Sequence, residues 1–332
     1  MIPVRPLGST GLPVSRLGLG LAALGRPGYI TLGRARDLPA ERTPAALAAR
    51  SADLLDVAHA AGVRYYDAAR SYGRAEEFLA RWLAERRIAR PAATVGSKWG
   101  YRYTAGWAAD APVHEQKELS LGRFISQLAE TRALLGAWLD LYQIHSATVE
   151  SGCLDDEPLL RTLVQGRRDG AYRALGLTLS GASSAATLAR ALTVRVDGER
   201  VFDVVQATFN CLEPSLATPL QRAHDAGLGV IAKEVFANGR LTDANARPED
   251  VRLLARLRAL AGGMSLDRLA LAFVLAHPFV DVALSGAATT PQLASHVAAV
   301  ELSLDATTLS ALGAVAEPPE RYWTTRSRLP WS

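Results

Sequence analysis

The sequence predicts an α/β fold, a (β/α)8 TIM barrel of eight parallel strands alternating with helices. The main observation is a regular alternation of short strand-like runs with longer segments whose apolar residues have helical spacing. Eight such units follow one another, which favours closure into a barrel over an open sheet. A second observation is that no G-x-G-x-x-G motif opens a helix after a strand with an acidic residue about 20 residues further on. That absence argues against a Rossmann domain.

The individual elements follow from local patterns. Strands are predicted at residues 16–21, 65–68, 94–97, 140–144, 174–179, 203–208, 229–232 and 282–285. The helices that follow them are predicted at 44–61, 75–86, 121–135, 157–168, 183–192, 216–226, 265–276 and 291–299, with an insertion helix at 248–261. Residues 4–15 have short apolar runs around Ser9, Thr10 and Gly11, a pattern typical of a β-hairpin ahead of the main fold.

Three segments interrupt this alternation. Residues 25–43 and 99–120 are long stretches, rich in glycine and aromatic residues, directly after the first and third strands. Loops of that length in a compact domain are usually functional or disordered. Aromatic residues in the second stretch, among them Trp99 and Tyr101, favour an ordered loop over the mouth of the barrel that contacts substrate. Residues 317–332 show no helical period and could fold back over the same face.

Composition narrows the class of protein. The 332 residues are expected to form one domain, residues 1–332, and carry a formal net charge of +4. No basic tract is interleaved with aromatic residues, so we expect no nucleic-acid partner. No apolar run approaches about 18 residues, and the N-terminus lacks the apolar core of a signal peptide. Two cysteines, Cys153 and Cys211, have neither a disulfide framework nor metal-ligand spacing. We therefore expect a cytoplasmic protein without a bound metal or a membrane anchor; its oligomeric state cannot be deduced.

Four residues at predicted strand ends carry the functional signal. Asp67, Lys98 and His145 end or follow three predicted strands, and Tyr72 lies five residues after Asp67. In a barrel of parallel strands the C-terminal strand ends converge on one mouth, so these side chains can meet. Lysine occurs only at positions 98, 117 and 233, and every other basic residue is arginine, most simply through a coding bias.

A phenol, an ammonium, a carboxylate and an imidazole suit the chemistry of a carbonyl group. Reduction of a carbonyl needs a general acid within hydrogen-bond reach of its oxygen. Tyr72 can be that acid, Lys98 can ease its proton transfer by favouring the phenolate, and Asp67 can fix the lysine. His145 can orient the carbonyl or relay the proton. Each residue alone has an ordinary structural explanation, as a cap, a turn aromatic, a solvated strand end or a core histidine. Their joint placement favours a site.

The same positions resemble a known family, the aldo/keto reductases. The stretch YDAARSYGRAE at residues 66–76 is similar to the family signature, with Asp and Tyr five apart and Gly after the Tyr. Segments VGSK at 95–98 and DLYQIH at 140–145 resemble its lysine and histidine segments. The opening RPLGSTGLPVS at 5–15 and LGLG at 17–20 resemble its hairpin and first strand. The resemblance spans about residues 4 to 300. It implies a (β/α)8 barrel that binds an extended nicotinamide dinucleotide.

The resemblance also implies cofactor contacts. Gln206, in VVQATFN, matches the glutamine that holds the nicotinamide carboxamide, and Thr178 stands where a serine is usual. Leu179 replaces the asparagine expected next, and Lys233 occupies the place of an aromatic that often stacks on the ring. Gly20, at the end of the first strand, is expected to lie against the cofactor.

The segment SGAATTP at residues 285–291 is expected to meet a cofactor phosphate. Pro291 is a plausible first residue of a helix there, and Gly286 and Thr289 would lie at its free backbone amides. No Lys or Arg occurs between Arg268 and Arg321. Recognition of a 2′-phosphate normally uses Arg or Lys, so NAD is favoured over NADP. Arg240 could still reach the phosphates.

The sequence therefore predicts an NAD(P)-dependent oxidoreductase acting on a small carbonyl or sugar substrate. Residues 179–181 and 233–239 resemble the sugar-oxidising branch of the family, which includes D-threo-aldose (L-fucose) and pyridoxal dehydrogenases. Three alternatives remain: an NADPH-dependent reductase of aldehydes and ketones, a barrel that senses cofactor without catalysis, and an isomerase or aldolase using Lys98 as a Schiff base.

Overall fold

Eight parallel strands close into a barrel in the computed structural model, which describes residues 2–38, 41–90 and 92–331. Around the barrel the strand order is β12-β13-β14-β3-β4-β5-β8-β9. The barrel strands are β3 (Leu17–Gly20), β4 (Tyr65–Asp67), β5 (Thr94–Trp99), β8 (Leu139–Ala147), β9 (Ala174–Leu179), β12 (Val204–Thr208), β13 (Gly229–Lys233) and β14 (Val282–Ser285). Each overlaps a strand predicted from the sequence, so the (β/α)8 barrel is confirmed.

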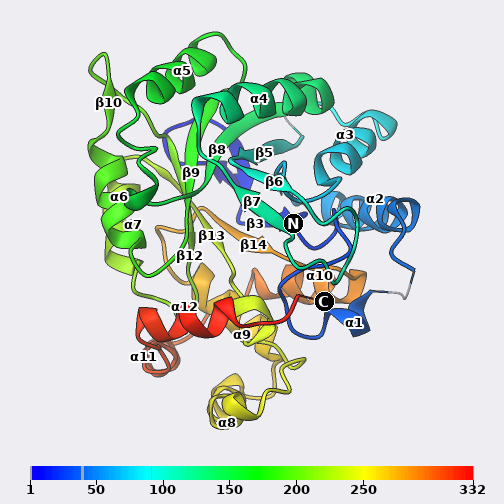
Figure 1. Ribbon diagram of the computed structural model, residues 1–332. Coiled ribbons are helices and arrows are strands. Elements are labelled where there is room, and N and C mark those ends of the chain that lie inside the picture. Colours follow the sequence, from blue (N-terminus) through cyan, green and yellow to red (C-terminus); the bar gives the residue numbers. More distant parts are fainter. Residues whose placement is uncertain (1, 39–40, 91, 332) are drawn as a thin grey trace.

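Helices surround the barrel on the outside (Figure 1). The helices of the described residues are α1 (Arg34–Asp37), α2 (Pro44–Ala60), α3 (Ala75–Glu85), α4 (Leu121–Leu135), α5 (Glu157–Arg168), α6 (Ser184–Thr193), α7 (Ala217–Asp225), α8 (Val251–Ala261), α9 (Leu266–Leu275), α10 (Thr290–Ala299), α11 (Ala306–Gly313) and α12 (Pro319–Ser327). Short 3-10 turns are η1 (Gly136–Trp138), η2 (Val149–Ser151), η3 (Ala237–Gly239) and η4 (Pro248–Asp250). Parallel strands are typically covered in this way because both sheet faces must be buried.

The predicted N-terminal hairpin forms from β1 (Val4–Pro6) and β2 (Pro13–Ser15), which pair antiparallel. Its apolar residues Leu7, Leu12 and Val14 are buried with side chains from inside the barrel. The turn lies against the start of β13, because the Ser9 amide donates to the Gly227 carbonyl at 2.9 Å. The hairpin therefore closes the end of the barrel at which the strands begin.

Two excursions cross the opposite end, where the strands finish. The segment after β5 folds into a second antiparallel hairpin, β6 (Tyr101–Tyr103) with β7 (Glu115–Lys117). A third, smaller hairpin, β10 (Arg195–Val196) with β11 (Glu199–Arg200), lies elsewhere on the outside. The C-terminal segment runs back toward the loop after β3, where Trp331 forms a β-bridge with Ile30 (Figure 1).

The C-terminal segment folds back as expected, but the expectation that it lacks a helix is wrong. Residues 319–327 form α12, which starts at a proline in its first turn. Tyr322 is its one buried side chain, and the Tyr322 hydroxyl accepts a hydrogen bond from Asn210 Nδ2 at 3.1 Å. A helix anchored through so few apolar residues shows little periodicity, and docking stabilises it in place of an apolar stripe.

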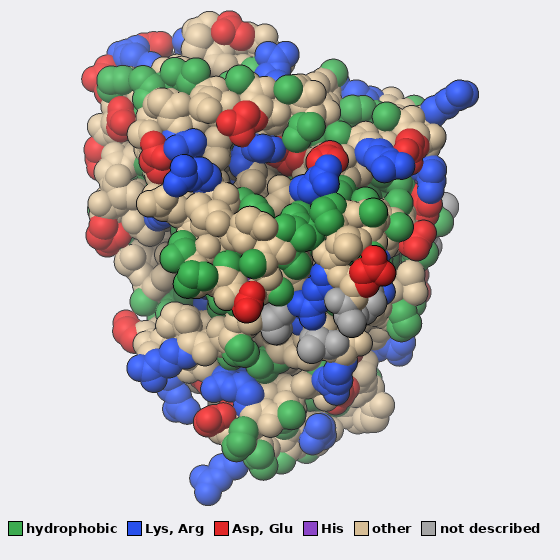
Figure 2. Space-filling view, turned by 45° about the vertical axis from the view of Figure 1, so that its right-hand side comes forward, with side chains coloured by type: hydrophobic (Ala, Val, Ile, Leu, Met, Phe, Trp, Pro, Cys, Tyr) green, Lys and Arg blue, Asp and Glu red, His purple; other side chains and the backbone are tan. Residues whose placement is uncertain are grey.

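On the face shown in Figure 2, acidic and basic side chains are interspersed and do not form one large patch of a single sign. Among the described residues, no helix is long and apolar enough to cross a membrane.

Candidate active site

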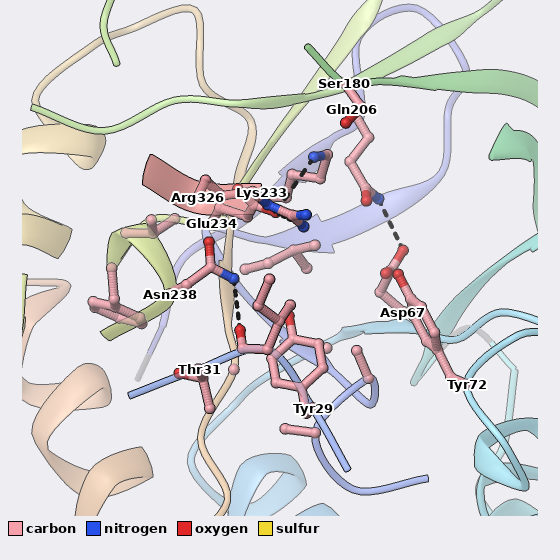
Figure 3. Close-up of a pocket in the computed structure, with 18 of the residues that line it drawn as sticks. Tyr29, Thr31, Asp67, Tyr72, Ser180, Gln206, Lys233, Glu234, Asn238 and Arg326 are labelled. Atoms are coloured by element: carbon pink, nitrogen blue, oxygen red, sulfur yellow. Dashed lines mark hydrogen bonds and ion pairs between the residues drawn. The ribbon is translucent and has the colours of Figure 1, made fainter. Parts of the chain in front are cut away.

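A cavity of about 210 Å³ opens at the C-terminal end of the barrel strands. Its wall includes residues from the ends of β3, β4, β12, β13 and β14, from the loop after β3 and from the C-terminal segment. Figure 3 shows Asp67, Tyr72, Gln206 and Lys233 directed toward this common space. Ends of parallel barrel strands are where such barrels usually hold their active sites.

Lys98 and Asp67 form a buried ion pair beneath the cavity. The Lys98 ammonium donates to Asp67 Oδ2 and to the backbone carbonyl of Ala68, the second contact at 2.9 Å. Both side chains are almost completely shielded from solvent, at 0% and 3% exposure. Burial lowers the pKa of Lys98, and the Asp67 carboxylate opposes that shift. This pair matches the arrangement predicted from the sequence.

The Asp67 carboxylate accepts two further hydrogen bonds. Tyr65 Oη donates to Oδ1 at 3.1 Å, and Gln206 Nε2 donates to the same oxygen at 2.9 Å. Tyr65 reaches it because position 96 is glycine: a Cβ there would lie 2.3 Å from the Tyr65 hydroxyl oxygen. The Tyr65 contact lies within β4, whereas the Gln206 contact joins β12 to the non-adjacent strand β4, so no local pattern in the sequence indicates it. They fix the orientation of the carboxylate and hence of the Lys98 ammonium.

Tyr72 and His145 lie above this pair. Tyr72 Oη is 3.5 Å from His145 Nε2, and the Lys98 ammonium lies 4.7 Å from the centre of the Tyr72 ring. His145 is directed into the mouth where β8 is irregular, since the register with β9 shifts between Ile144 and Ala147. Bulges of this kind often re-aim a side chain beside a functional site. The structure thus brings together all four residues that the sequence singled out.

The protonation of the two upper residues follows from burial. Burial, and then the charge of Asp67, raises the pKa of Tyr72 well above 10. Burial, and then the charge of Lys98, lowers the pKa of His145 well below 6.5. The phenol is therefore protonated and the imidazole neutral near pH 7. Burial and the nearby carboxylate have the larger net effect on the Tyr72 phenol, and the expectation that the Lys98 ammonium favours the phenolate stays a prediction.

The two aromatic residues expected to contact substrate are placed differently. Tyr101, on β6, lines the cavity, and its ring lies edge-on to His145 with the ring centres 4.9 Å apart. Trp99 is completely buried and packs edge-on against Phe124 of α4 instead. Successive side chains of a strand point to opposite faces, so the inward direction of Lys98 sends Trp99 outward. The expectation for Trp99 as a substrate contact is therefore corrected.

The upper wall of the cavity carries charges that the sequence did not connect. Arg26, from the loop after β3, donates to Glu115 of β7 at 2.9 Å. Glu234, just after β13, pairs with Arg326 of α12 at 2.7 Å. Burial raises the pKa of Glu234, but the positive charges of Arg326 and Lys233 outweigh burial and lower this pKa to about 2. Each pair joins segments far apart in sequence, which is why local patterns could not reveal it.

Lys233 lines the cavity, as expected of its position, and Thr178 does not. The Lys233 ammonium donates to Thr208 Oγ1 at 2.9 Å. Thr178 is fully buried, and its hydroxyl accepts a hydrogen bond from the Ser146 amide at 2.7 Å. The expectation that Thr178 contacts the cofactor is therefore corrected: it supports the irregular end of β8, while Ser146 and Ser180 line the cavity.

Arg240 lies away from the cavity, so its expected contact with cofactor phosphates is also corrected. Its guanidinium forms paired hydrogen bonds with Asp250, at 3.0 and 2.8 Å. It forms a second pair with Glu317, at 2.9 and 2.8 Å. The buried arginine thus connects the turn before α8 to the segment that leads into α12. Its role is structural because its guanidinium N–H groups are already hydrogen-bonded to the two carboxylates.

The start of α10 is partly closed by its own side chains. Thr289 caps the helix by accepting from the Gln292 amide at 3.3 Å. The Ala288 amide donates to Gln292 Oε1 at 2.9 Å, and the Ala287 amide donates to Ser285 Oγ at 3.2 Å. A phosphate bound here would have to replace some of these contacts. Thr289 therefore acts as a helix cap, and the expected phosphate contact stays a prediction.

The residues at the mouth fit an elongated ligand with a flat polar end. Gly20 and Gly286 both line the cavity. A Cβ at Gly286 would meet nothing within 4 Å, and one at Gly20 would meet only Ser285 O at 3.5 Å, so side chains there would occupy open space. Gln206 donates one amide N–H to Asp67, so a bound carboxamide could meet its second N–H and its amide oxygen. This donor and acceptor set fits a nicotinamide ring.

Comparisons with known proteins agree with this geometry. L-Galactose dehydrogenase of Arabidopsis thaliana is 26% identical over 336 residues, covering 96% of this chain and 95% of that protein. The solved structure of an aldo-keto reductase from Bacillus halodurans, in its holo form, superposes with a TM-score of 0.73 at 20% identity. That match covers 96% of this chain and 97% of the other. The structural match bears on the fold alone.

A family model covers most of the chain. The model described as "Aldo/keto reductase family" matches residues 16–317, a range that contains the barrel and the four residues Asp67, Tyr72, Lys98 and His145. Members of this family are oxidoreductases that use nicotinamide cofactors and act on small carbonyl or sugar substrates. The chain belongs to the aldo/keto reductase family.

Proposed function

We propose that the chain is an NAD(P)-dependent dehydrogenase of polyhydroxylated aldehydes, interconverting a cyclic hemiacetal and a lactone. The observation that carries this proposal is the joint geometry of the site. A complete proton-transfer group lies beneath a cavity whose upper wall is charged and rich in hydroxyl and amide groups. A hydroxyl-rich substrate can form additional hydrogen bonds with such a wall, whereas a simple apolar aldehyde would gain few of them.

Each residue beneath the cavity has one role in this proposal. Tyr72 exchanges a proton with the substrate oxygen, and neutral His145 accepts or donates a hydrogen bond to the same oxygen. Lys98 places a positive charge beneath the Tyr72 ring, and Asp67 holds that ammonium in position. The nicotinamide cofactor, when bound, supplies the acceptor or donor of the hydride. Its carboxamide would be held by Gln206.

The substrate class rests on two supports. The first is the polar cavity wall, in which Asn238, Ser180 and Tyr101 offer neutral hydrogen-bonding groups beside the charged ones. The second is the likeness to a protein named for its action on L-galactose, a sugar. The narrower candidate substrates, L-fucose-like aldoses and pyridoxal, are included in the substrate panel of the first test. Both carry a hydroxyl group that can close onto the aldehyde.

For the cofactor we propose a preference for NAD. The segment around α10 lacks Lys and Arg between Arg268 and Arg321. One arginine nevertheless comes from another element: Arg50 of α2 donates to the backbone carbonyls of Ala288 and Asp37 at 3.2 and 3.0 Å. These contacts engage one of its nitrogens in the protein. Arg50 is thus the residue to test if NADP binds unexpectedly well.

The first test is absorbance at the nicotinamide band with NAD and NADP in parallel. The panel contains aldoses, pyridoxal and simple aldehydes. We expect reduction of NAD by sugars. Oxidation of NADPH by simple aldehydes, without sugar activity, would replace this proposal with the aldehyde reductase. Loss of NADP binding in Arg50→Met, with NAD binding unchanged, would identify Arg50 as the residue that binds the 2′-phosphate.

The second test is Tyr72→Phe, which removes one hydroxyl group. We expect turnover to fall by about a thousandfold, the scale of a lost general acid, while the Kd for the cofactor changes little. Tyr103→Phe is the matched control, because Tyr103 lies on the neighbouring hairpin and does not line the cavity. Unchanged turnover in Tyr72→Phe would contradict the assigned role.

A further inference from the structure

The cavity wall holds a second lysine whose surroundings differ from those of Lys98. The Lys98 side chain is 0% exposed, and its ammonium is held by Asp67 and a backbone carbonyl. The Lys233 side chain retains 17% exposure and lines the cavity (Figure 3). Its hydrogen bond goes to a neutral hydroxyl, that of Thr208. Lys98 is thus enclosed, whereas Lys233 can be reached by a molecule in the cavity.

The nearest carboxylate binds Lys233 only loosely. Glu234 Oε1 lies 4.0 Å from the Lys233 ammonium, but 2.7 Å from Arg326. Because Arg326 also binds the Glu234 carboxylate, that carboxylate stabilises the Lys233 ammonium less strongly. Burial, opposed by Glu234, lowers the pKa of Lys233 to about 8. At pH 7 roughly a tenth of the Lys233 side chains then carry a neutral amine, compared with well under a thousandth for an ordinary lysine.

We propose that Lys233 is a site of reversible covalent capture for small hydroxyaldehydes. The amine nitrogen adds to the aldehyde carbon, and the carbonyl oxygen becomes the hydroxyl of a carbinolamine. Loss of that hydroxyl as water, with a proton, gives an imine between Lys233 and the aldehyde carbon. No oxidant or reductant is consumed. This chemistry differs from the oxidoreductase reaction and places the covalent lysine at 233 instead of 98.

The chain is well suited to a test because it contains only three lysines, at positions 98, 117 and 233. The protein, without nicotinamide cofactor, is mixed with glyceraldehyde at pH 7 and treated with sodium borohydride, which reduces any imine to a stable amine. Peptide mass mapping then locates the label. We expect Lys233 to be labelled at least about tenfold faster than Lys117 and Lys98 to stay unlabelled. The rate should rise with pH, with a midpoint near 8.

Lys117 is the internal reference because it is exposed on β7 and lies outside the cavity. The variant Lys233→Arg keeps the positive charge but cannot form an imine, and should lose the fast label. Equal rates at Lys117 and Lys233, or preferential labelling of Lys98, would overturn the proposal. Since labelling needs no turnover, its outcome is independent of whether the proposed dehydrogenase activity is found.

Discussion

The two ends of the barrel are built from opposite kinds of side chain. At the end where the strands begin, Leu7, Leu12 and Val14 of the hairpin pack on apolar residues inside the barrel. At the end where the strands finish, the ion pair of Lys98 and Asp67 lies beneath a polar cavity. The closed end gains stability from burial of apolar surface, whereas the open end holds buried charges that cost desolvation energy. Stability and chemistry are therefore separated along the barrel axis.

The largest effect should come from the open end, in the variant Lys98→Met. It leaves the Asp67 carboxylate buried without its cation, which should lower the free energy of unfolding by about 3–5 kcal/mol. Turnover should fall by at least about a hundredfold, because Tyr72 loses its neighbouring charge. Denaturant unfolding and steady-state kinetics measure the two quantities. The exposed Lys117→Met is the control. Equal changes in turnover and in the free energy of unfolding in the two variants would contradict the separation of stability and chemistry along the barrel.

A smaller loss of stability is expected from Arg240→Met, which removes the link between Asp250 and Glu317. Two carboxylates lose a shared partner, so the free energy of unfolding should fall by about 2–4 kcal/mol. Because Arg240 is placed outside the cavity, the Kd for the cofactor should stay within about twofold. Cofactor titration by fluorescence quenching decides this point. A large rise in Kd would restore the phosphate contact expected from the sequence.

The closed end can be tested with two glycines of one turn. Gly8 has φ +50°, and a Cβ there would lie 2.2 Å from the Gly229 amide nitrogen. Gly11 has φ +70°, but a Cβ there would meet nothing within 4 Å. Gly8→Ala should therefore cost about 1–3 kcal/mol more than Gly11→Ala in thermal or denaturant unfolding. Both should keep wild-type kcat per folded molecule; a lower kcat in Gly8→Ala would show that the two ends are coupled.

The smallest expected effect is the pH dependence of stability that His145 contributes. The pKa of His145 is lowered in the folded protein. Below about pH 6.5 the imidazole therefore binds a proton in the unfolded chain but stays neutral in the folded protein. The stabilisation is therefore present above that pH and is lost as the pH falls. Between pH 6.5 and 5.5 it should amount to about 1 kcal/mol. Urea unfolding of His145→Asn should show a shallower dependence of the free energy of unfolding on pH than the wild type, and an unchanged dependence would contradict this contribution.

The same comparison explains which site residues the sequence could place. Asp67, Lys98 and His145 lie at or near the C-terminal ends of barrel strands, and barrel geometry alone brings strand ends together. Trp99 was misplaced although the signal was present: strand alternation sends it outward once Lys98 points inward. Arg240 was misplaced because its partners, Asp250 and Glu317, lie on segments whose arrangement no local pattern fixes.

The sequence by itself determined the number and order of the barrel strands, the hairpin ahead of them and the four residues Asp67, Tyr72, Lys98 and His145 as a candidate site. These features depend on hydrophobic periodicity, which is a local property of the chain, and on the general rule that alternating strands and helices form a parallel sheet. Only the tertiary structure decided the bulge that aims His145, the contact of Gln206 with Asp67, and the charged wall that contains Arg26 and Arg326. The Gln206 contact and the two ion pairs of the wall join residues 89 to 139 positions apart, and such contacts arise only when the packed core fixes where each segment lies.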